Sequence, residues 1–320
     1  MDVAAVSGPA VSVIKPGMLT TVQDAGRWGF QAHGVPVAGP MDPVSHRLAN
    51  ALVGNGRGAA LLEITLIGPE LEFEDERLVA ITGARFELWL DGRQAPSQAP
   101  FTVCAGSRLR FGSRLLGARA YLAVSGGVAV PETLGSRSTH LVSAMGGVGG
   151  RALVGGDRLP LGDPSPQGPT LAPHEAIAPL PDRHAILRVL PGPQVDYFTA
   201  EALDVVQSAA YVVAGNSDRM GFRLHGPRLT HARGADIISD ATPLGVLQVP
   251  ASGQPILLMA DRQTTGGYPK IATVVAADMA VAGQLAPDDT ITFVVCTRAD
   301  AVRALIAQER ALMAVEDRHS

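Results

Sequence analysis

The run Leu61-Leu62-Glu63-Ile64-Thr65-Leu66-Ile67 is followed at once by the turn pair Gly68-Pro69. β-Branched and other apolar residues favour a strand in the run, and a glycine followed by a proline is typical of a sharp change of chain direction. Similar short runs continue through the first half of the chain, with turn pairs at Pro16-Gly17, Asp91-Gly92 and Gly126-Gly127. We expect strands at Val11–Ile14, Leu61–Ile67, Leu78–Ile81, Phe86–Leu90, Phe101–Cys104, Leu109–Phe111 and Ala120–Val124. The first half is therefore predicted to consist of short strands joined by tight turns.

The second half shows the same organisation, with helices at a few places. We expect strands at Ile186–Leu190, Tyr211–Val213, Ile237–Ser239, Gly245–Val249, Ile256–Ala260, Ile271–Ala276 and Ile291–Cys296. Helices are predicted after Pro43, around Ala200–Val206 and over Ala301–Met313, where apolar residues recur at helical spacing. A length of 320 residues favours two domains, which we place at residues 1–165 and 182–320, with a proline-rich linker at 166–181. The predicted fold class is mainly β with a few helices.

Composition excludes several classes of partner. A net charge of −4 with mixed signs gives no reason to expect nucleic acid or an anionic membrane. No signal peptide and no apolar stretch of membrane-spanning length is visible, so we expect a cytoplasmic protein. The two cysteines, Cys104 and Cys296, lie in apolar runs and are expected to be buried. No histidine pair with metal-ligand spacing lies near them, so no metal site is predicted.

Lysine is rare, since only Lys15 and Lys270 occur among 26 basic side chains. Neither follows a glycine, so neither belongs to a phosphate-binding P-loop, and neither has the Met-Lys-Met setting of a biotin carrier. The glycine-rich segment Gly146–Gly156 has a loose dinucleotide spacing, but Gly155 and Gly156 would break the helix that such a site needs. We read it as a hairpin or lid. If the activity uses ATP, another chain is expected to bind it, and no covalent biotin is expected here.

Three polar clusters remain as candidate sites: Thr20–Arg27, Asn216–Gly221 and Asp261–Lys270. In the first, Asp24 and Arg27 can bind substrate or pair structurally across the turn. The second is a binding loop or a plain connection. The third lies between two strand-like runs, and loops held by rigid strands are where binding groups concentrate. The third cluster is therefore the first choice for a functional site.

Within and around these clusters, seven stretches carry a family resemblance, and they span about residues 11 to 297. They are Thr21–Gly29 (TVQDAGRWG), Gly39–Asp42 (GPMD), Ala49–Asn55 (ANALVGN), Leu62–Pro69 (LEITLIGP), Arg119–Gly127 (RAYLAVSGG), Ser217–Gly221 (SDRMG) and Asp261–Pro269 (DRQTTGGYP). They resemble, in order, the biotin-dependent carboxyltransferase-like family that contains the C subunit of 5-oxoprolinase, KipA, allophanate hydrolase subunit 2 and the carboxyltransferase part of urea carboxylase.

The resemblance implies cyclophilin-like β-barrel units and a role as one subunit of an ATP-dependent 5-oxoprolinase. It also implies two partners, which are a KipI-like chain (the B subunit of 5-oxoprolinase) and a chain like its A subunit. The isolated chain would then be inactive. Two other readings stay open: a carboxyltransferase-type subunit that acts on a urea-like substrate, and a KipA-like regulator that binds a KipI-like kinase inhibitor without catalysis.

Candidate site residues follow from the clusters. Lys270, Asp261 and Asp24 are the predicted catalytic residues, because a compact ammonium can stabilise an anion and a carboxylate can orient it or act as a base. The alternative for Lys270 is a solvated side chain at the start of a strand. The predicted substrate-binding residues are Arg27, Asp218, Arg219, Thr264, Thr265, Gly266, Gly267 and Tyr268.

Overall fold

The computed structural model describes residues 8–164 and 177–316. Residues 166–176 of the expected linker lie outside the described residues. The chain divides into two compact units, and each is described by itself. The first unit contains the residues up to Arg27, then 43–180, and those from Ala311 onward. The second contains Trp28–Asp42 and Pro181–Arg310, so a short segment from the first half of the sequence belongs to it.

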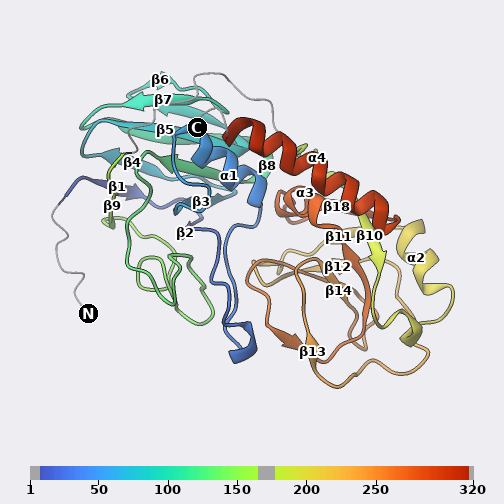
Figure 1. Cartoon of the computed structure of the whole chain (residues 1–320). Coiled ribbons are helices and arrows are strands. Elements are labelled where there is room, and N and C mark those ends of the chain that lie inside the picture. The colour runs from blue at the N-terminus through green and yellow to red at the C-terminus, as the bar shows by residue number, and fades with distance from the viewer. Residues whose placement is uncertain (1–7, 165–176, 317–320) are drawn as a thin grey trace. The chain divides into compact units, whose positions relative to one another are not determined.

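The first unit is built on a nine-stranded sheet whose centre is a pair of long strands. β5 (Arg77–Leu90) and β8 (Arg108–Val124) pair antiparallel from Val79 opposite Val124 to Leu90 opposite Leu109, and Figure 1 shows them in the same sheet. β8 also pairs with β3 near one end and β4 near the other. The remaining strands are β1 (Ala10–Lys15), β2 (Leu19–Gln23), β3 (Leu61–Thr65), β4 (Glu70–Phe73), β6 (Arg93–Gln94), β7 (Pro100–Val103) and β9 (Arg158–Pro160).

A helix covers part of this sheet. α1 (Pro43–Leu52) buries Leu48, Ala49 and Leu52 against a cluster that includes Tyr121. The helix predicted after Pro43 is confirmed, because the spacing of those apolar residues places them on one face. At its end, Gly54 adopts a left-handed conformation that glycine tolerates best.

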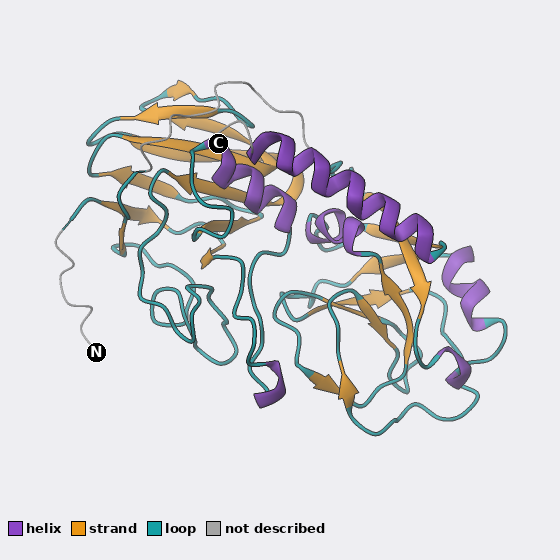
Figure 2. Ribbon diagram, viewed as in Figure 1, coloured by secondary structure: helices purple, strands orange, loops and turns teal. Residues whose placement is uncertain are grey.

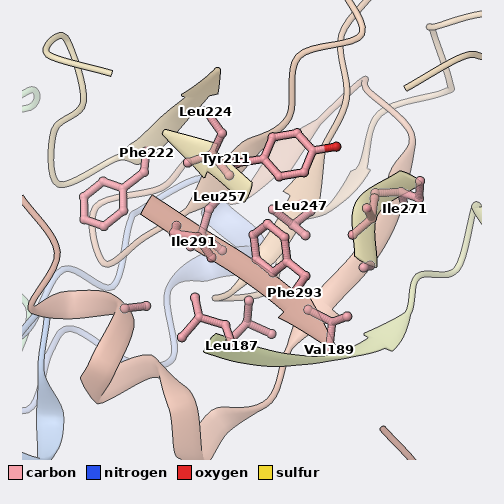
Figure 3. Close-up of a cluster of buried hydrophobic side chains, with 14 of the residues drawn as sticks. Leu187, Val189, Tyr211, Phe222, Leu224, Leu247, Leu257, Ile271, Ile291 and Phe293 are labelled. Carbon is pink, nitrogen blue, oxygen red and sulfur yellow. The ribbon is translucent and has the colours of Figure 1, made fainter. Parts of the chain in front are cut away.

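The second unit contains a closed barrel of seven strands. Neighbouring strands are antiparallel except β10 and β18, whose parallel pairing closes the ring. In barrel order the strands are β10 (His184–Pro191), β17 (Lys270–Val274), β14 (Val246–Gln248), β15 (Ile256–Leu258), β12 (Gly221–His225), β11 (Ala210–Val213) and β18 (Thr290–Val295). Alternate residues point into the barrel, where Phe222, Leu224 and Leu257 join a buried cluster, as Figure 3 shows.

Short elements complete the described chain. A two-stranded sheet pairs β13 (Asp240–Ala241) with β16 (Thr265–Gly266). The other helices are α2 (Ala202–Ser208), α3 (Met279–Gly283) and α4 (Arg298–Glu316), with 3-10 turns at Gln31–His33, Val195–Tyr197 and Ala276–Asp278. Figure 2 shows strands and loops prevailing over helices. The expected fold class, mainly β with a few helices and a barrel unit, is confirmed.

Two local predictions are wrong. Ile237–Ser239 is not a strand: Ile237 N donates to Gly267 O, but the ladder with β16 begins only at Asp240, and Ile238 is 94% exposed. Cys104 is exposed, because it follows the last residue of β7 and begins a turn, while Cys296 is half-buried. No helix in the described residues is long and apolar enough to cross a membrane.

Candidate functional site

A pocket of about 340 Å³ lies on the outer side of the barrel wall of the second unit. Arg223 of β12 and Ile256 of β15 line it, whereas their strand neighbours Phe222 and Leu257 belong to the barrel core. The period of two along each strand therefore separates the pocket from the core. Its polar lining consists of Asp218, Arg223, Gln248, Gln263 and Tyr268. Its other lining residues are Met220, Gly221, Pro250, Ile256 and Leu258.

A buried ion pair fixes the two loops beside this pocket. Arg219 donates from Nε to Asp261 Oδ2 at 3.0 Å and from Nη2 to Asp261 Oδ1 at 2.9 Å. Nη2 also lies 2.6 Å from the carbonyl oxygen of Gly39, which belongs to the same unit. The two side chains are only 4% and 2% exposed. The carboxylate of Asp261 thus anchors the loop that begins with it, and Arg219 is its partner.

Hydrogen bonds hold the loop from Arg262 to Tyr268 over the pocket side of the barrel. The carbonyl oxygen of Thr242 accepts a hydrogen bond from Arg262 Nε at 2.8 Å, and Thr242 Oγ1 donates a hydrogen bond to the carbonyl oxygen of Gln263. Its amide donates to Thr264 O at 3.0 Å. Thr265 and Gly266 then pair with β13, and Gly267 O accepts from Ile237 N at 2.8 Å. Tyr268 follows at the pocket.

Gly266 also packs closely against the pocket wall. A Cβ on Gly266 would come within 2.5 Å of Gln248 Nε2, so no larger residue fits without moving the amide. Gln263 Nε2 donates to Gln248 Oε1 at 3.3 Å. The loop thereby fixes the Gln248 side chain.

Lys270 is the first residue of β17, and its side chain is only 1% exposed. Its Nζ lies 3.0 Å from Asp240 Oδ2, and Asp240 is 53% exposed. The hydrogen bond from this ammonium holds the pKa of Asp240 below its ordinary value of 3.8. In the neighbouring strand β14, Gln248 pairs with Lys270, and a bulge shifts the register between Leu247 and Gln248.

Asp218 lies at the entrance to β12. Its Oδ1 accepts hydrogen bonds from Met220 N at 2.8 Å and Gly221 N at 3.2 Å, which fixes the carboxylate at the pocket. The second polar cluster of the sequence therefore has a structural role in the turn and a place in the pocket lining.

Asp24 belongs to the first unit, where it binds the segment from Thr133 to Ser138. Burial raises the pKa of Asp24, but hydrogen bonds from Ser138 Oγ, Ser136 Oγ and the backbone of Arg137 and Gly26 outweigh it and lower this pKa below 3.8. The carboxylate is therefore held ionised.

Arg27 binds the same segment through Thr133 O at 2.8 Å and Ser138 O at 2.9 Å. Asp24 and Arg27 thus brace one loop of the first unit, and their roles at a site stay predictions. Nearby, burial lowers the pKa of His46 to about 4, so this histidine is neutral at pH 7, with Nε2 3.3 Å from Gln23 O.

The structure thus brings Asp218, Tyr268 and the loop residues Thr264–Gly267 to one side of the barrel, beside the Arg219–Asp261 pair. Lys270 lies next to them in the sheet, and its partner is Asp240. The sequence analysis missed Arg223, Gln248 and Asp240, and it included Gln263 in the third cluster without naming it as a site residue. A polar residue inside an apolar strand run was the available signal for Arg223 and Gln248.

The glycine-rich segment Gly146–Gly156 does not begin a helix. Val148 and Arg151 form an isolated antiparallel bridge, and a Cβ at Gly147 would lie 2.0 Å from Thr139 Oγ1. These glycines permit close packing, and the segment does not fit a nucleotide phosphate site. In the described part of the chain no group of three or more His, Cys, Asp or Glu side chains is placed to hold a metal ion.

Comparisons with known proteins agree on one family. The carboxyltransferase domain family, subdomains A and B, matches residues 33–295. The C subunit of 5-oxoprolinase from Escherichia coli is 40% identical over 300 residues, which cover 94% of this chain and 96% of that protein. The urea amidolyase of Lachancea kluyveri is 37% identical over 96% of this chain, which matches only 18% of that much longer protein. The crystal structure of Kluyveromyces lactis urea carboxylase superposes with a TM-score of 0.90 and 35% identity, covering 97% of this chain and 29% of that one.

Proposed function

Because this chain belongs to the carboxyltransferase domain family, we propose that it is the C subunit of a multi-subunit, ATP-dependent 5-oxoprolinase. Such an enzyme opens 5-oxoproline to glutamate. The observation that carries the proposal is the match to the C subunit of the Escherichia coli 5-oxoprolinase, which runs along nearly the whole of both chains.

The chemistry explains why such an enzyme uses ATP and several chains. A lactam carbonyl is a poor electrophile, and transfer of a phosphoryl group to its oxygen makes attack by water feasible. The C–N bond then breaks to leave an acyl phosphate, and a second water displaces the phosphate, so one ATP and two waters give glutamate, ADP and phosphate. Fixed cationic or amide donors stabilise the charge that develops on oxygen. The glycine-rich segment of this chain does not fit a nucleotide, so a partner chain binds ATP.

Within this scheme the second unit supplies groups that handle the anionic substrate. Lys270 is a buried cation that pairs in the sheet with the pocket residue Gln248 and contacts Asp240. Asp261 keeps the loop from Thr264 to Tyr268 in place through Arg219. The partners are a KipI-like chain, which is the B subunit of the enzyme, and a chain like its A subunit. The complex works in the cytoplasm.

Reconstitution tests this function. The purified chain alone is expected to hydrolyse neither 5-oxoproline nor ATP. Addition of both partner chains should give glutamate in proportion to the ATP consumed, and size-exclusion chromatography should show this chain eluting with the KipI-like chain. Lactam opening by the single chain, or a complete complex without it, overturns the proposal.

A carboxyltransferase role on urea is the second candidate, favoured by the likeness to urea amidolyase and urea carboxylase. It requires a biotin carboxylase and a biotin carrier from other chains. Urea-dependent ATP consumption in the presence of those chains, without glutamate formation from 5-oxoproline, would establish it in place of the first.

A further inference from the structure

We propose that the pocket of the second unit binds the lactam itself, with the side-chain N–H of Gln248 donating to the lactam carbonyl oxygen and Arg223 binding the carboxylate. This inference rests on the proposed function, because it names the substrate groups that the same site recognises. It assigns roles to two residues that lie in the barrel strands, outside the loop from Asp261.

The side-chain amide of Gln248 has an N–H donor without an acceptor among the described residues. The residue lines the pocket and is only 1% exposed. Among the residues that the structure describes, its Nε2 has no hydrogen-bond partner. A buried amide N–H without an acceptor lowers the stability of the fold. An N–H that stays without one therefore points to an acceptor from outside the chain. A carbonyl oxygen is the simplest acceptor that fits.

The orientation of that amide is fixed by its neighbours. Its Oε1 accepts from Gln263 Nε2 at 3.3 Å, and the reverse orientation would bring two donors together. This hydrogen bond also polarises the amide and strengthens its N–H as a donor. The absence of a side chain at Gly266 leaves room for Nε2, which a Cβ would approach to 2.5 Å.

Arg223 provides a cation in the lining of the same pocket. Its side chain points out of the barrel wall between the inward-facing Phe222 and Leu224. Within residues 8–164 and 177–316 its guanidinium has no hydrogen-bonding or ion-pair partner, and it is exposed. A guanidinium binds a carboxylate through two parallel hydrogen bonds, so this arginine suits the carboxylate of 5-oxoproline.

The rest of the lining suits a small ring that carries both groups. Ile256 and Leu258 offer an apolar wall for ring carbons, and Met220 can adapt to their shape. Asp218 keeps its carboxylate at the pocket, where it accepts the lactam N–H. A ligand with a carbonyl oxygen, an N–H and a carboxylate on one five-membered ring satisfies all three polar residues.

Methyl NMR of the isolated chain tests this site, with 5-oxoproline as the probe and the signals of Met220 and Ile256 as reporters. Wild type is expected to show saturable shifts of both signals. Gln248→Met keeps the size of the side chain and removes the donor, and it should weaken binding roughly tenfold. Arg223→Ala should weaken it by a similar factor. The matched control is Arg228→Ala, an exposed arginine outside the pocket, which should leave the affinity unchanged.

Two further ligands separate the roles. 2-Pyrrolidinone lacks the carboxylate, so its binding should depend on Gln248 and not on Arg223, whereas proline lacks the carbonyl and should bind weakly to every variant. Equal affinities of wild type, Gln248→Met and Arg223→Ala for 5-oxoproline overturn the inference, as does the absence of saturable shifts. The reconstituted complex reports on the function separately: glutamate formation with unchanged KM in both variants rejects this pocket and leaves the proposed function standing.

Discussion

Arg219 and Asp261 form a two-point ion pair that is almost completely buried and joins loops 42 residues apart in sequence. The pair connects the stretch Ser217–Gly221 with the stretch Asp261–Pro269, which are two of the segments that carry the family resemblance. A buried carboxylate and guanidinium are each costly without the other, so the pair fixes which loops meet. This contact holds the loop that carries Gln263 against the barrel.

Arg219→Met is expected to lower the free energy of unfolding by about 3–5 kcal/mol, because it leaves the Asp261 carboxylate buried without its cation. Chemical denaturation of the isolated chain, followed by circular dichroism, measures the change.

The control is Arg233→Met, which removes the cation of an arginine–aspartate pair in the same unit. Arg233 and Asp196 are 61% and 53% exposed, so the loss should be below about 1 kcal/mol. Equal losses in the two variants would show that burial of the Arg219 pair contributes nothing.

The sequence predicted most strands because apolar runs of period two and turn pairs are local signals. It split β8 into two runs, because its middle (Gly112, Ser113, Arg114) is polar and carries no apolar signal. Pairing with β5, which is itself a long strand, keeps that segment extended, and this is a tertiary effect. Ile237–Ser239 shows the opposite error, an apolar run that lies next to β13 and is not itself a strand.

The candidate site was predictable only in part for the same reason. The loop from Asp261 was visible as a polar, turn-prone stretch between strands. Gln248 was marked only by its polarity within an apolar run, and Asp240 was not marked at all, because their contacts depend on the strands that pair with β14 and β13. The bulge that places Lys270 opposite Gln248 has no local sequence signal.

The turn at Pro16-Gly17 offers a steric prediction. Gly17 has φ of +72°, and a Cβ there would lie 2.3 Å from the carbonyl oxygen of Ile67. Gly92 has φ of +78° with open space around it. Gly92→Ala should therefore cost about 1–2 kcal/mol from backbone strain alone. Gly17→Ala should cost about 1–3 kcal/mol more, because the Ile67 carbonyl must move. Chemical denaturation compares the variants, and similar losses would show that the loop relaxes freely.

His46 makes the stability of the first unit depend on pH. Its folded-state pKa is about 4 and its ordinary value is 6.5, because burial disfavours the charged ring. The unfolded chain therefore binds the proton more readily, and stability falls as pH decreases from about 6.5 to about 4. At about 1.4 kcal/mol for each pH unit, the loss is about 3 kcal/mol.

Other groups titrate in this range, so the measurement is the difference between wild type and His46→Gln at several pH values. Their difference in unfolding free energy should shrink by about 3 kcal/mol between pH 7 and pH 4. Trp89 fluorescence in a Trp28→Phe background reports on the first unit, which contains Trp89. His33→Gln is the control, since His33 is exposed. A constant difference across the range would mean that the pKa of His46 is the same in the folded and the unfolded chain.

Substitution of Lys270 should lower the activity of the complex without preventing its assembly. Lys270 pairs in the sheet with the pocket residue Gln248, and its buried ammonium contacts the half-exposed Asp240, so we expect it to stabilise charge on the substrate. Lys270→Met keeps the length of the side chain and removes the charge. In the reconstituted complex we expect kcat to fall by about 100-fold or more, with the complex still assembling. In the isolated variant the pKa of Asp240 should rise back towards 3.8, which carboxyl NMR titration detects.

The other lysine of the chain provides the control: Lys15 is 72% exposed and pairs with Glu70 on the first unit, so Lys15→Met should keep wild-type turnover. A Lys270→Met complex that assembles normally and turns over at the wild-type rate removes Lys270 from the site, and the titration of Asp240 then measures only a structural pair.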